Sequence, residues 1–116
     1  MGFYSVRLLI RCEGKSQPRR IPFFEDRIVL VRSRSHEAAR KKAREIVNKN
    51  SVPYKNTSGH MVRWRVCKVY DSAELFEDEF GQNGEVKNGA QVYWRYIRSA
   101  DPVKRLKKEG TMNSLY

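Results

Sequence analysis

Apolar and polar side chains alternate along the chain in the pattern of half-buried β-strands. In the first such stretch one face is apolar, while the other carries Arg7 and Arg11. The second is apolar on both faces, so we expect it to lie in the centre of a sheet. The predicted strands are residues 3–12, 27–32, 61–70 and 92–98.

The main helix is predicted between the second and third strands. Ser35 is a favoured helix N-cap, and Glu37 stands in the first turn, where the helix dipole stabilises a negative charge. Apolar residues recur at helical spacing from Ala39 onward, and Pro53 bars continuation of the helix. Apolar positions in the acidic segment after the third strand, residues 71–80, predict a further short helix.

The C-terminal part of the chain has a helix signal of its own. The aspartate–proline pair at residues 101–102 is a cap with proline at the first helical position, which predicts a short basic helix. Its apolar face consists only of Val103 and Leu106, so we expect weak docking. The chain is therefore predicted to comprise one α+β domain, residues 1–99, and a basic extension, residues 100–116, formed by a short helix and a tail. We expect the extension to be dispensable for folding.

The order of the predicted elements is β-β-α-β-β followed by the short C-terminal helix. Strands joined by hairpins, with one helix packed across a face, form a two-layer α+β fold. We predict an antiparallel sheet of about four strands with one main helix on a face. The residues expected in the core are Val6, Leu8, Ile10, Leu30, Ala43, Ile46, Val47, Val62, Trp64, Val66 and Trp94.

Composition adds a strong positive charge to this picture. The 116 residues fit one domain, and 24 Lys and Arg against 13 Asp and Glu give a net charge of +11. One acidic segment, residues 71–90, interrupts the basic chain with six carboxylates against one lysine. A surface this basic attracts polyanions through counterion release. Alternatively, the positive charge serves only to keep the protein soluble and does not bind a specific partner.

Targeting signals and cysteine usage favour a cytoplasmic protein. No apolar run approaches the roughly 20 residues that span a bilayer, and the first six residues lack a charged region followed by an apolar one. Cys12 and Cys67 lie far apart in strand-like stretches without metal-ligand spacing, so we expect buried free thiols. We therefore expect a cytoplasmic location and no membrane partner.

The residues that catalysis requires are sparse. The only histidines are His36 and His60, which are far apart in the chain, and the glycines of residues 81–84 lack the lysine and the following helix of a phosphate-binding loop. The carboxylates of residues 74–79 have no metal-ligand spacing and favour a solvated face. We therefore predict that the protein is not an enzyme and holds neither a cofactor nor a metal ion.

Basic and aromatic residues interleave on the strands in a way that is typical of an anion-binding face. Arginines share a face in two of the predicted strands, and Arg95 shares one with Tyr93 in the last strand; these faces lie opposite the one expected to pack on the helix. Arginine pairs with phosphate and stacks on bases, as exposed aromatic rings do. Alternatively, these arginines simply form the solvent-facing polar side of an ordinary antiparallel sheet, without binding an anion. The predicted binding residues are Arg7, Arg11, Arg63, Arg65, Tyr93, Arg95, Lys104, Arg105, Lys107 and Lys108.

Two functions are compatible with such a surface. The first is an accessory protein that binds nucleic acid, RNA or single-stranded DNA, through its backbone phosphates. The alternative is a protein-binding module, such as a bacterial immunity protein or an inhibitor, that neutralises an acidic partner. An extended basic track favours nucleic acid, whereas a buried aromatic or arginine hot spot ringed by polar residues favours a protein.

The order of several short motifs resembles that of a known family. They are Phe3–Leu9, Phe24–Val31, the alanine-rich helix, Tyr54-x-Asn56-x-x-Gly59, Val62-x-Trp64, Val69–Asp71 with Glu74–Leu75, and Val92-Tyr93-x-Arg95. Together they resemble domain-of-unknown-function family 4288, over about residues 3–98. The resemblance implies a small stand-alone bacterial protein and supplies no catalytic residues. The basic charge and the basic C-terminal extension depart from the family pattern.

Overall fold

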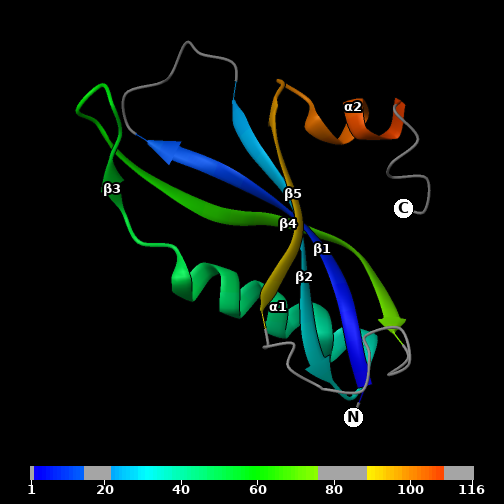
Figure 1. The fold of residues 1–116 in the computed structure, drawn as a ribbon. Helices are drawn as coiled ribbons and strands as arrows, with labels where there is room; N and C mark the ends of the chain where they lie inside the picture. The colour runs from blue at the N-terminus through cyan, green and yellow to red at the C-terminus, as the bar shows by residue number, and fades with distance from the viewer. Residues whose placement is uncertain (1, 15–21, 76–88, 109–116) are drawn as a thin grey trace.

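The computed structural model describes residues 2–14, 22–75 and 89–108. The strands are β1 Gly2–Gly14, β2 Phe23–Ser33, β3 Tyr54–Lys55, β4 Met61–Leu75 and β5 Ala90–Arg98; the helices are α1 His36–Asn50 and α2 Pro102–Lys108. All strand pairs are antiparallel, and the strand order is β3-β4-β1-β2-β5 (Figure 1). The predicted α+β class is confirmed, and the two-residue β3 adds a fifth strand to the predicted four.

β1 and β2 form the centre of the sheet because both carry apolar side chains on both faces. Val6 lies opposite Val29 in the register. In β1 the side chains of Leu8 and Ile10 point to the α1 side, and Leu9, which lies between them, points to the opposite side, where it joins a second apolar cluster. Apolar side chains on both faces thus allow a helix to pack on each.

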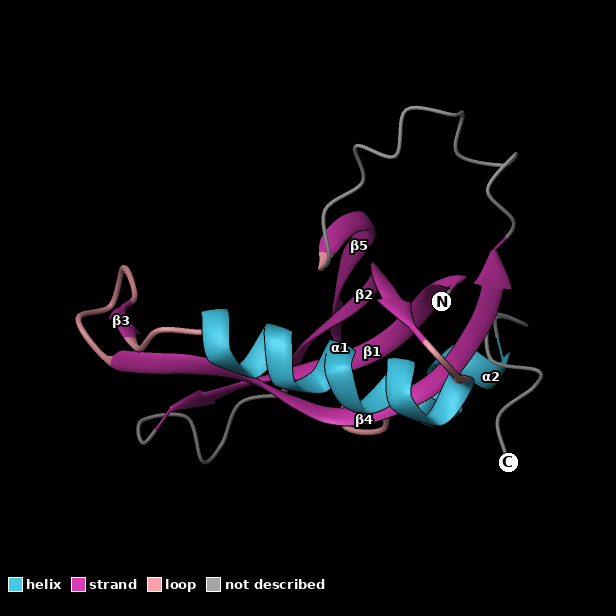
Figure 2. Cartoon of the chain, turned by 90° about the horizontal axis from the view of Figure 1, so that it is seen from below, coloured by secondary structure: helices cyan, strands magenta, loops and turns pink. Residues whose placement is uncertain are grey.

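α1 begins and ends where the sequence predicted. The Ser35 hydroxyl accepts a hydrogen bond from the Ala38 backbone N–H at 3.1 Å, which satisfies one of the free donors of the first turn. Lys49 lies in the last turn, where the helix dipole favours a positive charge. Figure 2 shows α1 lying along one face of the sheet. The buried residues of the helix are Ala39, Ala43 and Val47.

The buried residues of the sheet and α1 agree with most of the sequence prediction of the core. Val6, Leu8, Ile10, Leu30, Ala43, Val47 and Val62 are buried as expected. Ile46, Trp64 and Val66 are half-buried and pack against the core cluster. Trp94 is 51% exposed, so its prediction as a core residue is wrong. Its strand, β5, is an edge strand that α1 does not cover, which leaves the apolar face of β5 open at this position.

β4 differs from its predicted form in length and in register. It continues through Leu75, so the helix predicted from residue 71 onward is wrong as far as Leu75, and residues 76–80 lie outside the described part. The register against β1 shifts twice, between Arg7 and Leu8 and between Leu9 and Ile10. Each shift leaves one β4 residue, Cys67 or Tyr70, without a partner in β1. The shift at Cys67 inverts the alternation and places Tyr70 on the face opposite α1, which simple alternation does not predict.

α2 buries a leucine side chain more fully than the sequence suggested. Asp101 caps it by accepting a hydrogen bond from the Lys104 N–H at 3.0 Å, as predicted. Leu106, however, is fully buried and joins Leu9, Phe24, Tyr70 and Ile97 in a cluster on the face opposite α1. Leu106 is therefore a core residue, which the sequence did not predict. Sequence alone showed few apolar residues in this helix, but not the apolar cluster that receives one of them.

The cysteines also differ from expectation. Cys67 is exposed and Cys12 is half-buried, and both are free thiols, so the prediction of buried thiols is wrong. The Cys67 thiol contacts the Leu9 carbonyl oxygen at 3.3 Å.

Candidate functional site

A buried carboxylate organises the charged groups on the face opposite α1. Asp26 of β2 is fully buried and accepts hydrogen bonds from Arg7 Nε at 2.9 Å and Arg7 Nη2 at 2.5 Å. The Tyr70 hydroxyl donates to Asp26 Oδ1, and Arg95 Nε lies 3.5 Å from Asp26 Oδ2. The Arg7 guanidinium also stacks on the Tyr70 ring, 5.2 Å from its centroid. These four residues, named the Asp26 cluster below, join β1, β2, β4 and β5.

The Asp26 cluster changes the acid–base properties of its members. Burial raises the pKa of the Tyr70 phenol well above its ordinary value, and the hydrogen bond that the phenol donates to Asp26 raises it further. The hydrogen bonds to Asp26 raise the pKa of Arg7, which keeps this guanidinium charged at any accessible pH. The folded protein therefore keeps Arg7 charged and Tyr70 protonated into strongly alkaline solution.

We expect the buried Tyr70 phenol to make the protein less stable in strong alkali. Above pH ~10 the unfolded chain releases the Tyr70 proton while the folded chain retains it, so the free energy of unfolding falls by about 1.4 kcal/mol for each further pH unit. Tyr70→Phe removes this contribution and costs about 1 kcal/mol at neutral pH through the lost hydrogen bond. Urea unfolding between pH 9 and pH 11.5 measures both effects, and equal slopes in the two proteins would contradict the assignment.

The predicted arginine face exists, but two of its members are engaged. Arg7 and Arg95 belong to the Asp26 cluster, and their side chains are only 16% and 32% exposed. Arg63 is half-buried. Arg11 and Arg65 are exposed and lie directly opposite one another in the register of β1 and β4. The prediction of five open arginines is therefore wrong for Arg7 and Arg95, because it did not include the carboxylate between them.

The Arg11–Arg65 pair is unusual because like charges directly opposite in a sheet are destabilising. Within the described residues neither arginine forms an ion pair, although Arg11 lies over the Phe24 ring at 5.9 Å. A pair of exposed cations held side by side is a suitable contact for an anion. It lies on the sheet face that also receives α2.

α2 presents the remaining predicted cations to solvent. Because Leu106 faces the sheet, Lys104, Arg105, Lys107 and Lys108 lie on the outer surface of the helix and are exposed. Arg105 Nη1 donates to the carbonyl oxygen of Arg98 at 3.3 Å, so the basic helix is tied to the end of β5. The structure thus places the α2 cations beside the strand that carries the predicted Tyr93.

An exposed aromatic cluster on the α1 side of the sheet was missed by the sequence analysis. The Tyr96 ring contacts those of Phe23, Trp64 and Trp94, with centroids 5.1, 5.7 and 5.0 Å away. Trp64 Nε1 donates to the Tyr54 hydroxyl at 2.7 Å, which adds a fifth ring. Trp94, Tyr96 and Tyr54 are 51%, 52% and 47% exposed. The alternation of β5 did place Trp94 and Tyr96 on one face, but that face was expected to be buried.

Cations flank the aromatic cluster. The Arg98 guanidinium lies over the Phe23 ring at 4.7 Å and is itself exposed. Arg27 lies opposite Trp94 in the register and forms an ion pair with Glu25. Tyr93, on the other face of β5, is 40% exposed. The aromatic cluster therefore has cations beside it on its own face of the sheet.

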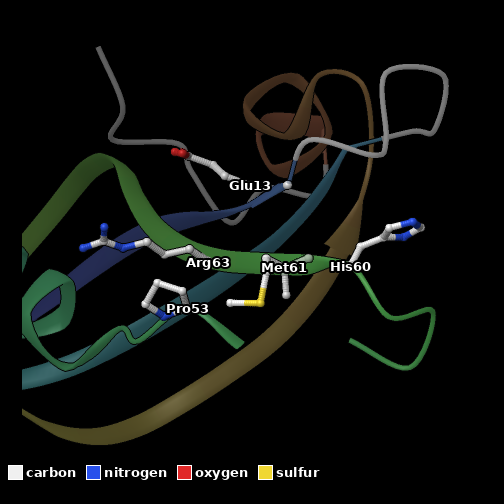
Figure 3. Close-up of a pocket in the computed structure, with 7 residues that line it drawn as sticks. Glu13, Pro53, His60, Met61 and Arg63 are labelled. Carbon is white, nitrogen blue, oxygen red and sulfur yellow. The ribbon is translucent and has the colours of Figure 1, made fainter. Parts of the chain in front are cut away.

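Two hollows accompany these surfaces. The first has a volume of about 680 Å³ and is lined by Glu13, Gly14, Pro53, His60, Met61, Val62 and Arg63. Figure 3 shows the His60 ring and the Arg63 guanidinium pointing in opposite directions, so the titratable groups of this hollow do not converge. The second, about 380 Å³, lies between the C-terminal end of α1 and the aromatic cluster.

The described residues contain little else with catalytic potential. His36 Nδ1 is hydrogen-bonded to Ser72 Oγ at 2.8 Å and its ring packs edge-on to Tyr4, so it is held by the fold. His60 is exposed. No group of three or more His, Cys, Asp or Glu side chains that could hold a metal ion occurs in the described ranges. Neither described helix has the length and apolarity needed to cross a membrane.

Comparison with protein families gives one match. The model of DUF4288, a domain of unknown function, matches residues 3–94. The chain belongs to the DUF4288 family. The resemblance in motif order is thereby confirmed, and the match includes the Asp26 position, the aromatic positions through Trp94 and the first half of β5, but not α2. No curated protein and no solved structure matches this DUF4288 chain.

Proposed function

We propose that this DUF4288 protein is a non-catalytic binding protein for single-stranded nucleic acid, RNA or DNA. The observation that carries the proposal is the exposed aromatic cluster at the sheet edge of a chain with a net charge of +11. Unpaired bases stack on exposed aromatic rings, and each stacked base contributes about 1–3 kcal/mol. Exposed apolar side chains gathered in one patch are typical of an interaction site.

The cations beside the aromatic cluster, on α2 and on the opposite sheet face supply the contacts to phosphate. Arg98 adjoins the aromatic cluster, and Arg105 of α2 is hydrogen-bonded to the Arg98 carbonyl oxygen. The sugar–phosphate backbone of a strand whose bases stack on the rings therefore runs on toward the cations of α2. The exposed Arg11–Arg65 pair extends the basic surface over the sheet. Binding through such cations releases counterions and weakens as the salt concentration rises. A cytoplasmic location, which we propose for the protein, provides both RNA and single-stranded DNA.

Trp94→Ala tests the stacking part of the proposal. We expect this variant to bind a nine-nucleotide uridine or thymidine strand about 5- to 150-fold more weakly than the unaltered protein, because one stacking ring is lost. Fluorescence anisotropy of the labelled strand measures the affinity. The affinity for duplex of the same length changes less, because its bases are not free to stack.

Val92→Ala is the matched control, since Val92 is 55% exposed on the same strand but offers no ring. It should bind the single strand as the unaltered protein does. Replacing the four exposed α2 cations by glutamine should instead flatten the dependence of affinity on salt. Strand affinity at physiological salt no tighter than the roughly 10⁻⁴–10⁻⁶ M of non-specific attraction would refute the proposal and favour an acidic protein partner.

A further inference from the structure

The pocket between the end of α1 and the aromatic cluster combines apolar walls with a charged pair. Its volume is about 380 Å³, within the range of small-molecule sites. Its lining includes Glu25, Arg27, Val52, Tyr54, Trp64 and Tyr96. Three of these side chains are members of the aromatic cluster, so the pocket is continuous with the proposed stacking surface.

The charged pair is held rigidly. Glu25 is 5% exposed, and Arg27 donates from Nε to Glu25 Oε2 and from Nη2 to Glu25 Oε1, the latter at 3.0 Å. A carboxylate has about four lone-pair sites and a guanidinium has five N–H donors. The two hydrogen bonds between them therefore leave acceptor sites on Glu25 and N–H donors on Arg27 for other partners. Burying such a pair is a weak source of stability. In a pocket with aromatic walls, such a pair suits the recognition of a flat ring whose edge carries hydrogen-bond donors and acceptors.

We propose that this pocket receives one guanine base of the bound strand. Guanine is the base whose Watson–Crick edge carries two adjacent N–H donors, which suit the Glu25 carboxylate, next to a carbonyl oxygen, which suits Arg27. The flat purine ring stacks against the exposed Tyr96 or Tyr54 ring. The inference rests on the proposed function, to which it adds a preference for one base.

Base preference in the unaltered protein is the first test. Binding of nine uridines is compared with binding of the same strand carrying guanine, adenine or cytosine at its central position. We expect the guanine strand to bind at least tenfold more tightly than the other three. Equal affinities for the four strands would overturn the inference and leave the proposed function standing, whereas no binding of any strand would overturn both.

Variants then locate the preference in the pocket. Glu25→Gln replaces an acceptor-only group by an amide and should abolish the guanine preference, while Glu45→Gln, the same change on the exposed face of α1, should retain it. Because Glu25→Gln also alters the ion pair with Arg27, Val52→Trp serves as a second variant. Val52 is 70% exposed, so a larger side chain there narrows the pocket without disturbing the core. A full guanine preference in both pocket variants would overturn the assignment to this pocket.

Discussion

Asp26→Asn should destabilise the protein by about 3–5 kcal/mol. The substitution keeps the shape of the side chain, so packing is conserved, but it removes the carboxylate that accepts hydrogen bonds from Arg7 and the Tyr70 hydroxyl and that lies 3.5 Å from Arg95 Nε. Arg7 is too deeply placed to recover full hydration, because its side chain is 16% exposed. A buried guanidinium without its counter-charge costs several kcal/mol. Urea unfolding followed by fluorescence measures the loss.

Glu45→Gln provides the control, because it makes the same chemical change on an exposed helix face and should alter stability by less than about 0.5 kcal/mol. A double-mutant cycle of Asp26→Asn with Arg7→Met should show a coupling of about 1–3 kcal/mol between the two side chains. If Asp26→Asn were no more destabilising than Glu45→Gln, the Asp26 cluster would not be part of what holds the four strands together.

Leu106→Ala should cost about 2–5 kcal/mol, the usual range for a buried leucine. Leu106 is fully buried against Leu9, Phe24 and Ile97, so its removal leaves a cavity between α2 and the sheet. This expectation reverses the one drawn from the sequence, in which residues 100–116 were dispensable for folding. Ending the chain after Ser99 should destabilise at least as much, because α2 then no longer covers this apolar cluster.

The melting temperatures of the variants provide the measurement. Lys107→Ala is the matched control, since it lies next to Leu106 in α2 but is exposed, and it should leave the melting temperature nearly unchanged. Equal melting temperatures for Leu106→Ala and Lys107→Ala would restore the original view of α2 as a loosely attached extension. A loss only in Leu106→Ala would separate the structural role of α2 from the proposed role of its cations.

The sequence by itself determined the features that depend on neighbouring residues. The Ser35 and Asp101 caps were predictable because a cap is a contact between residues three positions apart. The alternation of β1 predicted which side chains share a face, since successive residues of a strand point in opposite directions. The family resemblance, likewise carried by short motifs in order, is confirmed.

Only the tertiary structure decided what lies over each face. Alternation assigned Trp94 and Tyr96 to one face of β5, but their exposure depends on the position of β5 at the sheet edge, beyond the reach of α1. The β4 bulge that turns Tyr70 toward Asp26 also has no sequence signal in the alternating pattern. Asp26 pairs with residues 19 and 44 positions away in the chain, on two other strands. Such contacts depend on which strands become neighbours and in which register, and no local pattern of polar and apolar residues contains that information.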